Sequence, residues 1–243
     1  DRLWPSSRKM RFFVTHSIVD SLAVATALTQ QEYLEAIYEM AEEGIPTQQA
    51  RVAEWLDVTP ASVSEAVKRL SSRGLVQTGD DRRLRFTDEG EAVAGTLVRR
   101  HRLAERFLVE VVGLPWHLSH EEATEWGRVI SDRVEERLVQ ILDDPGTCVH
   151  GNPIPGSRHA VDQSDLLPLH EIAAGERVRL ERLTEDLELD LDVMKFFEQS
   201  GLMPGADIKV LGVAPDGTMT LEVAGEKVGL GSHLSDNLWV RPA

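Results

Sequence analysis

Histidine and glutamate residues with helical spacing are the clearest sign of chemistry in this chain. His101 and Glu105 are four residues apart in a segment with helical periodicity, so both side chains would lie on one helix face, one turn apart. His120 opens a second predicted helix. Imidazole and carboxylate groups together suit divalent cations such as Mn²⁺, Fe²⁺, Co²⁺ or Zn²⁺. The spacing predicts a metal site, with a hydrogen bond between surface residues His101 and Glu105 as the simpler alternative.

Charge is distributed unevenly along the chain. The 243 residues carry a formal net charge of −15. Basic and acidic residues nearly balance between 48 and 101, whereas the acidic excess lies mostly after residue 165. The net charge is therefore a poor guide to a nucleic-acid partner. The single cysteine, Cys148, excludes an intrachain disulfide and a zinc site made of cysteines, which suits a cytoplasmic protein.

Residues 1–28 resemble a signal peptide only in part. Basic residues precede an apolar stretch, which is the general pattern of such peptides. His16 and Asp20 interrupt that stretch, and a DNA-binding pattern follows it. We interpret residues 1–28 as a helical or partly disordered N-terminal extension. No apolar run reaches the roughly 18–20 residues of a transmembrane helix, so no membrane partner is expected.

Residues 29–87 have the pattern of a winged helix-turn-helix domain. Apolar residues recur with the helical period over 31–40, with Thr29 as the N-cap and Glu32 as its capping-box partner. A second helix is predicted over 47–56. A short turn separates it from a longer third helix, and this order is that of a helix-turn-helix, whose last helix reads the major groove of double-stranded DNA.

The third predicted helix, residues 60–73, and the arginine-rich hairpin after it would contact DNA. Pro60 occupies the first helical position, where its missing N–H costs little, and Thr59 is the N-cap. The hairpin would act as a wing that reaches phosphates or the minor groove, although a solvated surface is the simpler interpretation of any charged hairpin. The predicted DNA-contacting residues are Thr59, Pro60, Ser62, Ser64, Lys68, Arg69, Arg82, Arg83 and Arg85.

Two long amphipathic helices are expected within a helical domain that covers residues 88–157. They span roughly 88–112 and 120–142, and their apolar residues recur with the helical period. Inward-facing positions expected in the second helix are Ala123, Trp126, Val129, Ile130, Val134, Leu138 and Ile141. Two such helices after a winged helix normally form a dimer interface, so we expect a homodimer that reads a palindromic operator.

The C-terminal part is predicted to be a small β-barrel. A linker covers residues 158–170 and the barrel domain residues 171–243. Residues 177–183 alternate as a strand, 190–200 have the helical period, and 207–223 contain a hairpin around an Asp-Gly turn.

Five segments together carry a family resemblance. They are residues 33–38, the predicted wing, 101–106, 131–138 and 151–156, the last with the sequence Gly-Asn-Pro-Ile-Pro-Gly. Over about residues 29–243 the chain resembles the diphtheria toxin repressor family of iron- and manganese-dependent transcriptional regulators. The resemblance implies a mainly α fold with small β parts: a winged helix-turn-helix, a helical metal-binding and dimerisation domain, and an SH3-like domain of the FeoA type. It implies a metal-dependent DNA-binding repressor of metal-ion homeostasis genes, and no enzyme.

The resemblance also implies two metal sites. The ligands of the ancillary site carry over to His101, Glu105, His120, Glu185 and Glu188. Because no thiol or thioether is expected among them, Mn²⁺ is favoured, with Fe²⁺ as the alternative. The second site departs from the family pattern. Its positions fall on Glu32 and Glu35 of the first helix and on Thr124, Gly127 and Arg128, and the last three are poor ligands.

Two interpretations of the altered second site remain open. In the one we favour, the Arg128 guanidinium lies between Glu32 and Glu35 in place of a metal. In the other, Glu121 or Glu125 helps to build a displaced metal site. An altered site also makes a metal-independent DNA-binding regulator the main alternative function. A metalloenzyme is disfavoured, because no constellation of general acid and base accompanies the histidines, and no small-molecule substrate is expected.

Overall fold

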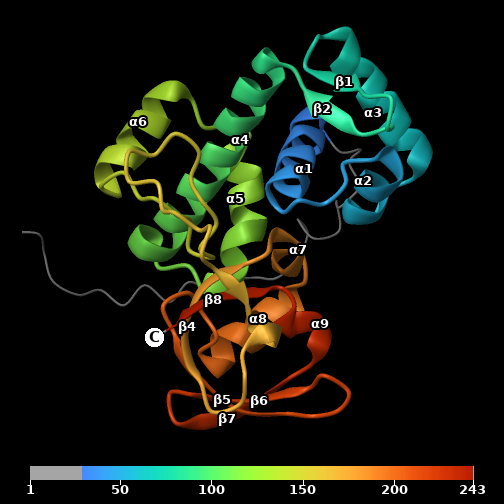
Figure 1. The fold of residues 1–243 in the computed structure, drawn as a ribbon. Coiled ribbons are helices and arrows are strands. Elements are labelled where there is room, and N and C mark those ends of the chain that lie inside the picture. The colour runs from blue at the N-terminus through green and yellow to red at the C-terminus, as the bar shows by residue number, and fades with distance from the viewer. Residues whose placement is uncertain (1–28, 243) are drawn as a thin grey trace, which may run out of the picture.

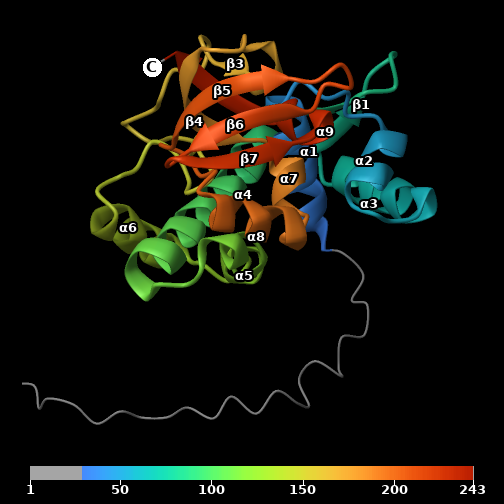
Figure 2. The ribbon, with the colours of Figure 1, turned by 90° about the horizontal axis from the view of Figure 1, so that it is seen from below.

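The computed structural model describes residues 29–242 (Figures 1 and 2). The predicted N-terminal extension, residues 1–28, lies outside the described residues. Between residues 29 and 242, no helix has both the length and the apolarity that a membrane crossing requires. Three buried clusters of apolar side chains correspond to an N-terminal winged helix, a helical middle part and a C-terminal sheet.

The first cluster belongs to a winged helix-turn-helix. Thr29 and Glu32 form the predicted capping box at the start of the first helix, and Thr59 caps the third helix with Pro60 in its first turn. Val63 on the third helix is fully buried, so the opposite face of that helix points to solvent. The elements are α1 (Gln30–Glu42), α2 (Gln49–Trp55), α3 (Pro60–Ser72), β1 (Val76–Thr78) and β2 (Leu84–Phe86).

The helical domain packs α5 against the long helix α4, while α6 lies farther out (Figure 1). Its elements are α4 (Asp88–Phe107), a π-helical turn η2 (Leu108–Val112), a short 3-10 helix η3 (Trp116–Leu118), α5 (Ser119–Gly127) and α6 (Asp132–Ile141). The prediction of one continuous helix over 120–142 is wrong. Ser131 has an extended backbone as the N-cap of α6, which interrupts the helix after Gly127 and turns the chain.

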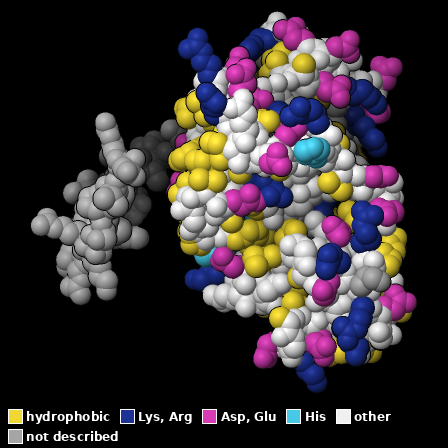
Figure 3. All heavy atoms as spheres, turned by 90° about the vertical axis from the view of Figure 1, so that its left-hand side faces the viewer, with side chains coloured by type: hydrophobic (Ala, Val, Ile, Leu, Met, Phe, Trp, Pro, Cys, Tyr) yellow, Lys and Arg dark blue, Asp and Glu magenta, His cyan; other side chains and the backbone are white. Residues whose placement is uncertain are grey.

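This break also corrects the predicted burial of the second long helix. Ala123, Ile130 and Leu138 are buried as expected. Four apolar residues that were predicted to face inward are exposed instead, one on α5, one between the two helices and two on α6. They are Trp126, Val129, Val134 and Ile141, with exposed fractions of 40%, 82%, 47% and 57%. Figure 3 views the molecule from the side on which α6 lies and shows groups of apolar side chains among charged ones there.

The C-terminal domain is a six-stranded antiparallel sheet with the order β3-β8-β4-β5-β6-β7. Phe197 of α8 is fully buried against the sheet. The predicted barrel is not closed: β3, at one edge, has two residues, and one of them is Pro168, which has no N–H to donate. The remaining elements are β3 (Leu167–Pro168), η4 (Leu169–Glu171), β4 (Arg177–Leu183), α7 (Glu185–Glu188), α8 (Leu191–Ser200), β5 (Asp207–Val213), β6 (Met219–Val223), β7 (Glu226–Leu230), α9 (Ser232–Ser235) and β8 (Leu238–Pro242).

Candidate metal centre

Three of the predicted ligands meet between α4 and α5. His101 and Glu105 lie one turn apart on α4, and the distance from His101 Nε2 to Glu105 Oε1 is 3.2 Å. His120 lies near the start of α5, with its Nδ1 atom 3.3 Å from His101 Nε2 and 3.4 Å from Glu105 Oε1. The side chain of Glu105 is 1% exposed, so its charge depends on the groups around it.

The short helix α7 brings the two other predicted ligands to this place. Glu188 Oε2 lies 3.1 Å from His120 Nδ1. One carboxylate oxygen of Glu185 lies within 4.8 Å of ligand atoms of His120 and Glu188. However, Glu185 Oε1 also accepts two hydrogen bonds from Arg102, from Nε at 3.1 Å and from Nη2 at 2.6 Å. All five predicted residues are therefore brought together, and Glu185 is shared with an arginine.

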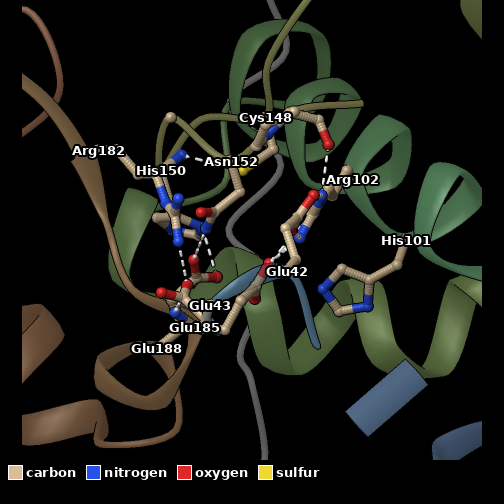
Figure 4. Close-up of polar contacts among 12 residues, drawn as sticks. Glu42, Glu43, His101, Arg102, Cys148, His150, Asn152, Arg182, Glu185 and Glu188 are labelled. Atoms are coloured by element: carbon tan, nitrogen blue, oxygen red, sulfur yellow. Dashed lines mark hydrogen bonds and ion pairs between the residues drawn. The ribbon is translucent and has the colours of Figure 1, made fainter. Parts of the chain in front are cut away.

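Two further candidate ligands come from the loop after α6, and sequence reasoning missed them. His150 is fully buried, with Nδ1 3.2 Å from Glu105 Oε1 and 2.7 Å from Glu188 Oε2 (Figure 4). Cys148 offers its sulfur within 4.8 Å of ligand atoms of Glu105 and His150. The expectation that no thiol lies among the candidate ligands has to be corrected. The Cys-x-His spacing just before Gly151 was the available signal.

The arrangement of these donor atoms fits a divalent cation. With bonds of about 2.1 Å, a cation separates neighbouring ligand atoms by about 3.0 Å in octahedral and about 3.4 Å in tetrahedral geometry. The contacts among His101, Glu105, His120, His150 and Glu188 run from 2.7 to 3.4 Å. Among the described residues, Glu105 Oε2 and His150 Nδ1 are buried without a well-aligned hydrogen bond. Buried polar atoms left in this state indicate a site that takes a further partner.

The electrostatics of the cluster are those of carboxylates that need a compensating positive charge. Burial opposes the charge on His120, but the hydrogen bonds that its ring donates to the carboxylates of Glu105 and Glu188 hold the pKa of the imidazole well above its usual range. Burial acts against ionised Glu105, yet the charges of His150 and His101 keep its pKa well below the usual value. Burial and the nearby Glu185 raise the pKa of Glu188. The neighbouring carboxylates raise the pKa of His150 as well, so protons on His120 and His150 supply the charge that a cation would supply.

The loop over residues 151–156 supports the centre from outside the ligand set. Asn152 donates from Nδ2 to Glu188 Oε1 at 2.7 Å, which orients the carboxylate towards the histidines. Gly151 has a positive φ of 92°, and a Cβ atom there would lie 2.0 Å from the carbonyl oxygen of Glu181 on β4. Only glycine allows this approach between loop and sheet. The loop motif therefore positions His150 and Asn152 together.

The altered second site contains an ion pair. Arg128, at the end of α5, lies with Nη2 2.8 Å from Glu32 Oε1 on α1, and its Nη1 lies 2.9 Å from Glu125. Glu35 is partly buried; burial raises its pKa, while His101 acts in the opposite direction. Glu125 is 70% exposed and Glu121 is exposed, and both point away from the interior.

Thr124 and Gly127, the other two positions of the altered second site, contact residues of the histidine cluster. Thr124 donates its hydroxyl proton to the backbone oxygen of His120 at 2.9 Å. Gly127 packs on the backbone of His101. A cavity of about 310 Å³ lies between the two sites and adjoins His101 and His120. Its lining includes Glu32, Glu35, Glu39, His101, His120 and Thr124.

The residues predicted to contact DNA all lie on the surface. Ser62, Ser64 and Lys68 point outward from α3, and Arg69 pairs with Glu65 at 2.5 Å. Arg82 takes a positive φ of 62° in the turn of the hairpin. The placement is that of a helix-turn-helix with a wing, and DNA contact by these residues stays a prediction. The exposed set is Thr59, Pro60, Ser62, Ser64, Lys68, Arg69, Arg82, Arg83 and Arg85.

The fold and the centre together define a class of protein, a winged-helix regulator with a metal-binding helical domain. Residues 26–84 match the N-terminal DNA-binding domain of iron-dependent repressors. Residues 87–156 match the metal-binding and dimerisation domain of the same repressors, and residues 167–242 match the FeoA domain. The chain belongs to the iron-dependent repressor family, which consists of DNA-binding transcriptional regulators and not of enzymes.

Individual relatives cover most of the chain. Iron-dependent repressor IdeR of Mycobacterium tuberculosis is 39% identical over 208 residues, covering 82% of this chain and 90% of the relative. Diphtheria toxin repressor of Corynebacterium efficiens is 40% identical over 190 residues, with coverage of 75% and 83%. Among solved structures, a manganese-dependent transcriptional repressor in complex with manganese aligns with a TM-score of 0.77 at 28% identity, covering 88% of this chain and all 100% of that one. The predicted family and three-part fold are confirmed.

Proposed function

We propose that this protein is a homodimeric, metal-responsive repressor that binds a palindromic DNA operator and controls metal-ion homeostasis genes in the cytoplasm. The observation that carries this proposal is the position of the candidate metal centre. Its donors come from α4 and α5, from the loop after α6 and from α7 of the C-terminal domain. One cation there would touch the helical domain and the FeoA domain at once.

His101, Glu105, His120 and Glu188 are the proposed ligands, with Glu185 and His150 beside them. Protonated histidines lose their positive charge when they deprotonate, whereas a bound divalent cation would keep its charge. Mn²⁺ is the expected metal and Fe²⁺ the alternative, since imidazole and carboxylate oxygen suit both. The nearby Cys148 thiol is buried, which together with the charge of Glu105 raises its pKa to about 12. Imidazole and carboxylate groups outnumber this single thiol among the candidate ligands, which keeps the preference for Mn²⁺ or Fe²⁺.

Helix α4 connects the candidate metal centre to the DNA-binding domain. α4 begins directly after the wing and carries His101 and Glu105 on its second half. Holding α4 against α5 and α7 restricts how the winged helix is oriented. In a dimer, this orientation sets the distance between two recognition helices, which must match about one turn of DNA. Metal binding raises DNA affinity only if the ligands close more tightly in the DNA-competent arrangement.

The exposed apolar side chains of α5 and α6 support the homodimer. A group of exposed apolar side chains on a monomer often marks an interface with another protein. Four such side chains lie on neighbouring elements of the domain that matches the metal-binding and dimerisation domain: Trp126, Val129, Val134 and Ile141. A two-fold interface uses the same patch on both subunits. Analytical ultracentrifugation should therefore show a dimer, and Val129→Asp should shift it towards monomer.

At the second site we propose that Arg128 takes the place of a metal. Its guanidinium contacts Glu32 at 2.8 Å and thereby joins α5 to the first turn of α1. The displaced site is disfavoured, because Glu121 and Glu125 point to solvent. This permanent cation is also the observation that favours the second candidate function, a constitutive DNA-binding regulator whose affinity does not depend on metal.

Fluorescence anisotropy of labelled promoter DNA at fixed salt separates the two functions. Titrations are run in chelator and then with Mn²⁺, anaerobic Fe²⁺ or Zn²⁺. A tenfold or larger gain in DNA affinity with one metal, about 1.4 kcal/mol of coupling, supports the metal-responsive repressor. Tight binding that is identical in chelator supports the constitutive regulator instead.

A further inference from the structure

The C-terminal end of α1 carries two consecutive carboxylates that contact arginines of the other domains (Figure 4). Arg102 of α4 lies with Nη2 2.6 Å from Glu42 Oε2. Arg182 of β4 donates to Glu43 Oε1, which also accepts the backbone N–H of Glu185 at 3.4 Å. Arg102 in turn donates to Glu185 Oε1 at 2.6 Å. We call Glu42, Glu43, Arg102, Arg182 and Glu185 the α1–α7 clamp.

Glu42 and Glu43 are unfavourably placed within α1. The C-terminal end of a helix is the negative end of its dipole, where acidic side chains are unfavourable. α1 has no basic residue in its last turn to compensate Glu42 and Glu43. Their compensation comes from Arg102 and Arg182, which belong to two other domains. A sequence that breaks a local rule in this way indicates that the residues serve the junction between domains.

The clamp is also buried, so its charges depend on one another. The side chain of Arg102 is 1% exposed, that of Glu185 3% and that of Glu43 5%. Loss of one partner leaves an uncompensated charge away from water, which is strongly unfavourable. The position of α1 is therefore sensitive to the position of Glu185.

Helix α7 belongs to both the clamp and the metal centre. Glu185 is its first residue and contacts Arg102 and Glu43. Glu188, its last residue, lies 3.1 Å from His120 Nδ1. Because these four residues form one helical turn, a movement that draws Glu188 towards the histidines also moves Glu185.

We propose that the α1–α7 clamp couples the metal centre to the winged-helix domain, with Arg102 and Arg182 as positioning residues. The inference rests on the proposed function, because coupling requires that the centre binds a metal. When α7 closes on α4 and α5, Glu185 holds Arg102 in the position from which it contacts Glu42. The backbone N–H of Glu185 then also reaches Glu43. The winged helix then follows the FeoA domain directly through the end of α1, in addition to its covalent connection through α4.

Arg182→Gln tests the clamp without touching a proposed ligand. DNA affinity is measured in chelator and with Mn²⁺, and Mn²⁺ affinity is measured with and without DNA. If wild type gains tenfold or more, the variant should gain less than about threefold. Binding linkage is reciprocal, so the gain in Mn²⁺ affinity caused by DNA should fall by the same factor. Hydrogen exchange adds a second signal: Mn²⁺ should protect residues 39–45 in wild type but not in the variant.

Arg179→Gln is the matched control, because Arg179 lies on the same strand and pairs with Asp207 within its own domain. It should keep the full coupling. Glu43→Gln is a second test variant of nearly the same shape, in case Arg182→Gln unfolds in a thermal melt. Full coupling in both Arg182→Gln and Glu43→Gln overturns the clamp and leaves the proposed function standing. A wild-type protein without any metal effect overturns the proposed function and the clamp with it.

Discussion

The candidate metal centre and the Glu32–Arg128 pair connect helices of different domains in contrasting ways. In the centre, at least two carboxylates and three imidazoles converge within hydrogen-bonding distance. At the pair, one guanidinium contacts Glu32 at 2.8 Å. A guanidinium keeps its charge at every physiological pH, whereas the centre gains its charge from protons or a cation. One connection between the domains is therefore permanent, and the other depends on what is bound.

This difference implies a division of labour. Glu32 belongs to the capping box of α1 and accepts from Thr29 at 2.6 Å while it contacts Arg128. The pair therefore joins the start of α1 to the end of α5 through a charge that does not depend on pH or on a bound metal. Glu42 and Glu43 at the other end of α1 reach the part of the molecule that surrounds the metal centre. The start of α1 is held by an ion pair between two side chains of the chain. Its end is held by ion pairs with residues near the candidate metal centre, and metal binding could change these contacts.

The largest expected effect is at the centre itself. Glu105→Gln removes the carboxylate that contacts His101, His120 and His150 and replaces it with a neutral amide of similar shape. Mn²⁺ affinity should fall about 100-fold or more, since even residues that only orient ligands change affinity by 10–100-fold. Isothermal titration calorimetry with Mn²⁺ measures this loss.

Glu89→Gln is the control for that change. Glu89 lies on the first turn of the same helix and is exposed, so its loss should leave Mn²⁺ binding within about twofold of wild type. If Glu105→Gln bound Mn²⁺ as tightly as the control does, the centre between α4, α5 and α7 would not be the metal site.

A smaller effect is expected at the permanent pair. Arg128→Gln should weaken DNA binding about tenfold, about 1.4 kcal/mol, in chelator and in Mn²⁺ alike, because α1 loses its contact with α5. The number of metal ions bound should not change. Glu125→Gln removes only the exposed partner of Arg128 and should leave DNA affinity unchanged. Loss of one metal equivalent in Arg128→Gln would contradict the role of Arg128 as a replacement for a metal.

A gain of function sharpens the contrast between the two sites. The family resemblance implies Glu and His at the positions of Gly127 and Arg128. An added Cβ at Gly127 would make ordinary contacts of 3.5 Å with the backbone of His101, so the backbone there accepts a Cβ without a clash. The double variant Gly127→Glu, Arg128→His should bind one more Mn²⁺ per chain than wild type. An unchanged stoichiometry would show that Glu32 and Glu35 cannot complete such a site.

Local sequence signals predicted the elements well, and the long-range contacts less so. Thr29 and Thr59 cap helices as predicted, because a cap depends on residues within one turn. The break at Ser131 was missed, because apolar periodicity continues through residues that change direction.

The same distinction holds for the site. His101 and Glu105 were predicted from their spacing on one helix. His150 reaches the site only because Gly151 lets its loop approach β4, and the contact between Glu185 and Arg102 joins residues 83 positions apart. Neither contact leaves a periodic signal in the sequence.

The wing contains a third kind of ion pair, and a substitution there should have the smallest effect on DNA affinity. Arg85 donates to both carboxylate oxygens of Asp81, at 2.9 and 2.6 Å, on an exposed hairpin. Hydrogen bonds from Arg85, and then from the backbone of Arg83, lower the pKa of Asp81 to about 2. The carboxylate is therefore ionised whenever DNA binding is measured, and it competes with phosphate for Arg85.

Asp81→Asn should consequently raise DNA affinity, by about two- to fivefold at low salt, and steepen its salt dependence by about one phosphate contact. Asp80→Asn removes the same charge from the neighbouring exposed residue without freeing Arg85. Titrations at several salt concentrations separate the two variants. Equal gains would mean that only net charge matters at the wing. A gain confined to Asp81→Asn, in chelator and Mn²⁺ alike, would show that the wing contributes phosphate contacts that neither the metal centre nor Arg128 controls.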